Sequence, residues 1–185
     1  MAIDREDTLK KAEKLLRQGK LDAAVAEYLQ VVEENPGDWA TANTLGDLYV
    51  RVGQPDLAAA QYIRIGRHFV DEGFYPKAGA IYKKLLKLRP DDESVQMALA
   101  DISHKQGLLA DAKAQLNSVA ARRRARGDKA GAAQIVVQLG SVDPADFDAR
   151  TLAARTLIEM GDEEGAGRGK VAAARRGVHT GTIVL

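Results

Sequence analysis

Residues 39–72 read WATANTLGDLYVRVGQPDLAAAQYIRIGRHFVDE, and this stretch carries a clear helical pattern. Its first half carries apolar or small residues three and four positions apart, the spacing that places side chains on one face of an α-helix. These residues are Ala42, Leu45, Leu48, Tyr49 and Val52. Gly53 follows the last of them, and Pro55 stands where a second helix would begin. Because glycine favours helix ends and proline favours first turns, the stretch predicts two helices, over 38–52 and 55–72.

The residues that interrupt helices return every 54 positions. Three ladders share this period: Pro36, Pro90 and Pro144; Gly19, Gly73 and Gly127; and Gly53, Gly107 and Gly161. Three coincident ladders indicate an internal repeat. We therefore expect one helical repeat domain over 1–166, made of a partial unit (1–36), two full units (37–90 and 91–144) and another partial unit (145–166). The residues after it, 167–185, are expected to form a weak capping helix and a disordered basic tail.

The same periodicity predicts about ten helices along the chain. Their expected ranges are 4–18, 21–34, 38–52, 55–72, 75–88, 91–106, 109–126, 128–140, 145–160 and a weak one after 163. Asp91 and Asp92 can cap the free N–H groups at the start of the helix near them. Connections this short require neighbouring helices to run antiparallel.

Composition bounds the possible functions. The 185 residues are 45% hydrophobic and 29% charged, which is enough apolar content to bury a core. The net charge of +1 gives no general attraction to nucleic acid or membranes. The chain has no cysteine, which excludes disulfides and thiolate metal sites. Without an apolar signal segment or membrane span, we expect a soluble protein in the cytoplasm.

The stretch 39–72 resembles the tetratricopeptide repeat through Trp39, Leu45, Gly46, Tyr49, Ala58, Tyr62 and Ile65. Residues 5–36 resemble the second half of that repeat through Ala24, Tyr28, Val31 and Pro36. Residues 59–90 resemble it again through Gly66, Ala78, Tyr82, Leu85 and Pro90. Small residues let two helices approach closely, and the large ones fill the space around the crossing. Val70 stands where the repeat usually closes with proline.

This resemblance implies an all-α fold, a right-handed α-solenoid or superhelix of antiparallel helix pairs. The spacing departs from a plain array, because successive matches lie 34 and then 20 residues apart. Helix 55–72 then serves as the second helix of one repeat and the first helix of the next. In such a three-helix unit, this helix is neither simply inner nor simply outer.

For function, the resemblance implies a non-enzymatic scaffold or adaptor that binds a partner protein or peptide on a repeat surface. No phosphate-binding glycine loop or nucleophile elbow is present, and no cofactor is expected. The three histidines, His68, His104 and His179, are scattered, so no metal site is expected either. An alternative is self-association into a homodimer, because an incompletely capped end could stack on another copy.

We predict a partner-binding surface from polar residues on the first helices of the better-matched repeats. These are Asn43, Asp47, Arg51, Asp101, His104, Lys105 and Arg155. Positions 47, 101 and 155 are one period apart and could form a ladder along one surface. The alternative is that all seven belong to the solvated faces of amphipathic helices. The asparagine–lysine clamp that some family members use for a terminal carboxylate is not evident, because Asp47 and Asp101 would repel it.

Two further clusters have competing interpretations. Arg122, Arg123, Arg124 and Arg126 end helix 109–126. They could bind nucleic acid or an acidic partner, or could simply be cations well placed at a helix C-terminus. No aromatic residues interleave with them, which disfavours nucleic acid. Phe69, Phe74, Tyr75 and Tyr82 gather around one loop, and we interpret them as core.

Overall fold

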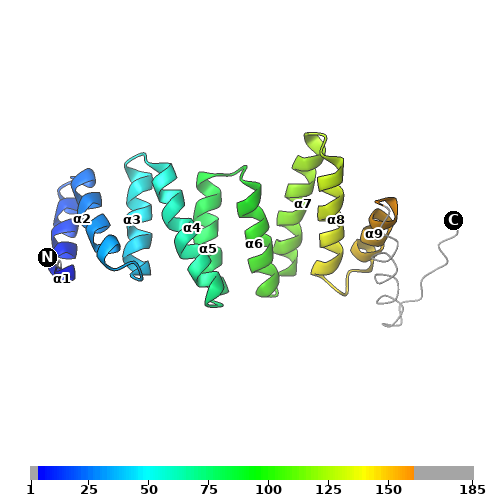
Figure 1. Ribbon diagram of the computed structural model, residues 1–185, viewed down its shortest axis with the longest axis horizontal. Coiled ribbons are helices and arrows are strands. Elements are labelled where there is room, and N and C mark those ends of the chain that lie inside the picture. Colours follow the sequence, from blue (N-terminus) through cyan, green and yellow to red (C-terminus); the bar gives the residue numbers. More distant parts are fainter. Residues whose placement is uncertain (1–3, 161–185) are drawn as a thin grey trace. The chain divides into compact units, whose positions relative to one another are not determined.

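The computed structural model describes residues 4–160, and in this part of the chain it contains nine α-helices and no strand (Figure 1). They are α1 (Arg5–Arg17), α2 (Leu21–Glu34), α3 (Trp39–Arg51), α4 (Pro55–Asp71), α5 (Tyr75–Leu88), α6 (Glu93–Lys105), α7 (Leu109–Ala125), α8 (Lys129–Val142) and α9 (Phe147–Glu159). The all-α prediction is confirmed, and each of these helices begins and ends within two residues of its expected range. The tenth helix and the tail 167–185 lie outside the described residues.

The chain forms two compact units, Met1–Val95 and Gln96–Leu185, which we describe separately. In the first, α2 packs against α1 and α3, and α4 packs against α3 and α5. In the second, α8 packs against both α7 and α9. No helix in the described part of the chain is both long and apolar enough to cross a membrane.

Two kinds of loop explain the 54-residue period. Loops of three residues carry a glycine at their centre, and five of these glycines have φ between 73° and 82°, where other residues are strained. They are Gly19, Gly53, Gly73, Gly107 and Gly127. Loops of four residues carry a proline at their second position, at Pro36, Pro90 and Pro144. From α1 to α9 the loop lengths run three, four, three, three, four, three, three and four, which repeats after every third helix.

Each proline-containing loop ends in an aspartate that caps the next helix. Asp38 accepts a hydrogen bond from the Thr41 N–H, Asp92 from those of Ser94 and Val95, and Asp146 from that of Ala149. Such a cap stabilises a helix by about 1 kcal/mol. The capping role predicted for Asp92 is confirmed. Asp38 and Asp146 were not predicted, although they lie one period on either side of it.

An ion pair ties each of these loops to the helix two before it. Arg5 of α1 binds Asp38, and Lys113 of α7 binds both Asp143 and Asp146 at 2.9 and 2.8 Å. The position equivalent to Arg5 and Lys113 in α4 is the buried Ala59, which carries no charge. There the loop supplies the cation instead, because Arg89 binds Asp56 of α4 at 2.9 Å.

Small residues face aromatic rings where α4 crosses its neighbours. A β-carbon built at Gly46 of α3 would lie 2.7 Å from the ring of Tyr62 in α4. A β-carbon built at Gly66 of α4 would lie 2.7 Å from the ring of Tyr82 in α5. Both distances are shorter than real carbon contacts, so any larger residue at either position would require the tyrosine ring to move. The predicted close approach at Gly46 is confirmed. On each side of α4, a tyrosine ring of one helix packs against the backbone of a glycine in the other helix.

The Lys113 ion pairs give the second unit a defined pH dependence. Hydrogen bonds from Lys113 hold the pKa of Asp143 and Asp146 below the usual range, and the backbone N–H groups of Ala145 and Ala149 lower it further. The same contacts raise the pKa of Lys113. Since the two carboxyls have lower pKa values folded than unfolded, their contribution to stability is present above about pH 4 and is lost as the pH falls through the folded values.

We therefore expect Lys113→Met to raise the pKa of both carboxyls toward about 3.9, because only the backbone hydrogen bonds remain. Titration of the side-chain carboxyl carbons by NMR measures this directly. Lys129→Met, which removes an exposed cation from the start of α8, is the matched control and should leave both values unchanged. Unchanged pKa values in Lys113→Met would show that the lysine does not stabilise the carboxylates.

Candidate functional site

Two of the predicted binding residues, Asn43 and Asp47, belong to a polar cluster inside the first unit. The Lys84 ammonium of α5 donates to Asn43 Oδ1 at 2.9 Å and to the two Asp47 oxygens at 2.6 and 2.8 Å. The Tyr62 hydroxyl of α4 donates to Asp47 Oδ1 at 2.5 Å. We call Asn43, Asp47, Tyr62 and Lys84 the polar cluster. It joins three helices, and Lys84 had not been predicted.

The tyrosine of this cluster is locked as a donor. Burial raises the pKa of the Tyr62 hydroxyl well above its usual range, and the hydrogen bond to the Asp47 carboxylate raises it further. The side chain is only 2% exposed. The hydroxyl therefore stays protonated at neutral pH and fixes the orientation of Asp47, which leaves that carboxylate less available to a partner than the sequence suggested.

The second unit does not repeat the polar cluster. One period further on, the four positions are occupied by Met97, Asp101, Leu116 and Gln138. Leu116 is buried in the apolar core of that unit and Met97 packs against it. Asp101 instead pairs with Lys105 on the exposed side of α6 at 3.0 Å.

The remaining predicted residues, Arg51, His104 and Arg155, are exposed on α3, α6 and α9. The structure thus brings Asn43 together with Asp47, and Asp101 together with Lys105. That the seven residues bind a partner stays a prediction.

The arginine cluster at the end of α7 is partly engaged by its own loop. Arg123 donates to the carbonyl oxygen of Gly131 at 3.0 Å, and Arg126 pairs with Asp128 at 3.5 Å. These contacts fasten the end of α7 to the start of α8. A role in binding an acidic partner or nucleic acid stays a prediction for the four arginines.

The interpretation of the aromatic cluster as core is wrong for Phe74, which is 48% exposed. It belongs to a row of rings at the surface. Trp39 stacks on His68 with ring centroids 4.1 Å apart, His68 lies 5.6 Å from Phe69, and Phe69 meets Phe74 edge-on at 6.4 Å. We call Trp39, His68, Phe69 and Phe74 the aromatic strip. Phe74 lies in the loop that ends at α5.

Cations lie over both ends of the aromatic strip. The Arg64 guanidinium is 5.1 Å from the Trp39 ring centroid. The Lys77 ammonium lies 5.6 Å from the Phe69 ring and 4.9 Å from the Phe74 ring. These distances fall within the range of cation–π attraction.

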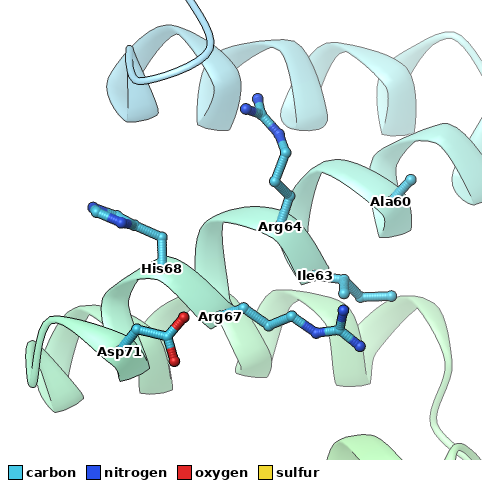
Figure 2. Close-up of a pocket in the computed structure, with 6 residues that line it drawn as sticks. All are labelled: Ala60, Ile63, Arg64, Arg67, His68 and Asp71. Carbon is cyan, nitrogen blue, oxygen red and sulfur yellow. The ribbon is translucent and has the colours of Figure 1, made fainter.

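A groove of about 610 Å³ runs along α4 and meets the aromatic strip at His68 (Figure 2). Its walls are formed by Ala60, Ile63, Arg64, Arg67, His68 and Asp71. All six lie on the side of α4 away from Tyr62 and Gly66, which pack inward. Figure 2 shows Arg64 and His68 pointing to one side of the helix and Arg67 to the other.

The groove carries unneutralised positive charge. Arg64 donates to the Pro36 carbonyl and to Gln61 Oε1, which are both uncharged acceptors. In the described part of the chain Arg67 forms neither a hydrogen bond nor an ion pair. Asp71 is the single acid of the lining. The sequence did contain a signal for this site, since Arg64, Arg67 and His68 follow helical spacing on the face opposite Ala58, Tyr62 and Ile65.

These features define a class of protein: an all-α helical repeat that presents side chains on its surface and, among its described residues, has no group of metal-ligating side chains. Models of the tetratricopeptide repeat match residues 9–65 and 69–128, which together are more than half of the sequence. The chain belongs to the tetratricopeptide repeat family.

Individual relatives are distant. BBSome complex member BBS4 from Bos taurus is 31% identical over a match that covers 50% of this chain and 21% of that protein. The chain thus spans about a fifth of the length of this relative. Among solved structures, BtubC from P. vanneervenii is 16% identical with a TM-score of 0.44, covering 98% of this chain and 92% of that one. A tetratricopeptide repeat protein from Parabacteroides merdae is 17% identical with a TM-score of 0.31, covering 92% and 79%.

Lys84→Met tests whether the polar cluster stabilises the first unit. Because Lys84 and Asp47 are 36% and 47% exposed, we expect the free energy of unfolding to fall by about 1 kcal/mol or less. Asp47→Asn should lose part of the same energy, so the two changes together should cost less than their sum. Urea unfolding followed by circular dichroism measures all three variants.

Lys83→Met is the control, because Lys83 is the exposed neighbour of Lys84 on α5. It should leave the urea midpoint unchanged. If Lys84→Met and Asp47→Asn prove strictly additive, the ion pair between them contributes nothing.

Proposed function

We propose that this protein is a non-enzymatic scaffold that binds a partner protein or peptide on the surface of its repeats. The observation that carries the proposal is the α4 groove together with the aromatic strip. Exposed aromatic and arginine side chains are enriched where proteins bind one another. Here both kinds lie side by side, and Phe74 and Arg67 are exposed rather than packed in the core.

The size of the groove supports the same proposal. Its volume of about 610 Å³ lies within the range of about 300–1,000 Å³ typical of ligand-binding clefts. It is also open along the helix, which suits a chain segment better than an enclosed small molecule. The rigid crossings at Gly46 and Gly66 hold α4 in place, so little ordering of the helix is needed when a partner binds.

The residues predicted from sequence give a second location for the same function. Asp101, His104 and Lys105 on α6, and Arg155 on α9, are exposed side chains of the second unit. We retain them as an alternative surface, to be separated from the α4 groove by mutation. We also place the protein in the cytoplasm, a proposal with which the absence of cysteine agrees.

Self-association is the second candidate function. Three large apolar side chains on or next to α9 are exposed: Leu152, Ile158 and Met160. Exposed apolar patches of this kind can mark contacts between copies. Sizing chromatography over a range of concentrations distinguishes a homodimer from a monomer, and a monomer at the highest concentration would exclude the dimer.

The scaffold proposal is tested by selecting binders from a random-peptide phage library on the immobilised full chain. We expect peptides whose affinity falls about tenfold in Arg67→Ala/Phe74→Ser, because such exposed anchors each contribute on the order of 1 kcal/mol or more. The matched variant Asp101→Ala/Arg155→Ala should bind them as the wild type does.

Two other outcomes are informative. If the second variant loses binding and the first retains it, the function stands but its location moves to the second unit. If repeated selections yield no peptide above the empty support, the scaffold proposal is wrong.

A further inference from the structure

We infer that the occupant of the α4 groove is an acidic segment of a partner protein, with carboxylates beside Arg64 and Arg67 and one large apolar side chain on the aromatic strip. This inference rests on the proposed function and names the chemistry of the partner. The segment's carboxylates belong to side chains, so it needs no free chain terminus.

Charge complementarity decides the acidic character. Arg64 and Arg67 line the groove and have no carboxylate partner among residues 4–160, and Lys77 adds a third cation over the aromatic strip. Arginine is the side chain best suited to bind carboxylates, because its planar fork can donate two parallel hydrogen bonds. Arg67 has all its donors available, and Arg64 can add to the attraction through its charge.

The two arginines set the minimum number of carboxylates in the segment. Arg64 and Arg67 point to opposite sides of α4, so one carboxylate is needed beside each of them (Figure 2). The groove from Ala60 to Asp71 is about 16 Å long at 1.5 Å per residue, which corresponds to about five extended residues.

The position of Asp71 decides at which end of the groove the apolar side chain of the segment lies. This carboxylate lies at the end of the groove that adjoins the aromatic strip, and it would repel an acid placed there. Phe74, by contrast, offers exposed ring surface at that end. The carboxylates thus belong beside Arg64 and Arg67, and the apolar side chain belongs on the aromatic strip.

The test uses peptides selected on the wild-type chain, resynthesised with both termini blocked. Their sequences should be enriched in Asp or Glu and should contain one aromatic or large aliphatic residue. Trp39 is the single tryptophan of the sequence, so its fluorescence reports binding at the strip itself. We expect the emission of Trp39 to change on binding and the affinity to fall with added salt.

Charge reversal gives the decisive comparison. Arg64→Glu/Arg67→Glu should lower the affinity of these peptides by about tenfold or more, because the carboxylates then face like charge. Lys83→Glu/Lys87→Glu makes the same change of charge at two exposed positions of α5 and should change the affinity less than about threefold. Arg67→Gln should also weaken binding, and since Arg67 forms no hydrogen bond it tests the site even if the double variant folds poorly.

The inference is overturned if the selected peptides show no acidic enrichment, or if both charge-reversed pairs bind them equally. The scaffold function would survive either result, whereas failure to select any peptide would remove it. A labelled DNA oligonucleotide that competes for the groove with equal affinity would also overturn the inference, because the site would then attract any polyanion.

Discussion

The structure of the first unit depends on two tyrosine rings. Each ring occupies the space that a β-carbon would take at a glycine of the neighbouring helix. At the α3–α4 crossing, Tyr62 occupies the space beside Gly46, and at the α4–α5 crossing, Tyr82 occupies the space beside Gly66. Because protein interiors are close-packed, each crossing admits one arrangement of its two helices. The rotation of α4 about its axis is fixed as a result, and Arg64, Arg67 and His68 must lie on its outer face.

The equivalent positions of the second unit carry residue pairs of different sizes. Ala100 and Leu116 replace Gly46 and Tyr62 one period later, and Ala120 and Val136 replace Gly66 and Tyr82; all four are buried. Alanine is larger than glycine, but leucine and valine are smaller than tyrosine. The volume gained on one helix is therefore offset on the other, and cores tolerate substitutions of this kind. This exchange has a consequence at the surface, because Leu116 has no hydroxyl with which to orient Asp101. The two units therefore share the pattern of their helices and loops but not the polar cluster.

The helices and loops could be predicted from sequence because their determinants are local. A glycine with positive φ or a proline in a loop ends a helix within a few residues. The 54-residue period repeats this signal several times along the chain. The polar cluster could not be predicted in the same way, since Lys84 lies 41 and 37 residues from Asn43 and Asp47 and meets them only through packing of three helices. Phe74 was misplaced for a related reason: whether a ring beside a loop is covered depends on distant elements. The caps Asp38 and Asp146, however, could have been predicted, because they lie one period before and one period after Asp92.

The crossing at Gly46 is tested most directly by adding one methyl group in two backgrounds. We predict that Gly46→Ala in the wild-type chain lowers the free energy of unfolding by about 1–2 kcal/mol, because the buried ring of Tyr62 cannot move aside. In the Tyr62→Leu background the same change should raise it by up to about 1 kcal/mol, because alanine favours helix more than glycine does. Urea unfolding followed by circular dichroism measures both. An equal effect of Gly46→Ala in the two backgrounds would show that the Tyr62 ring does not restrict position 46.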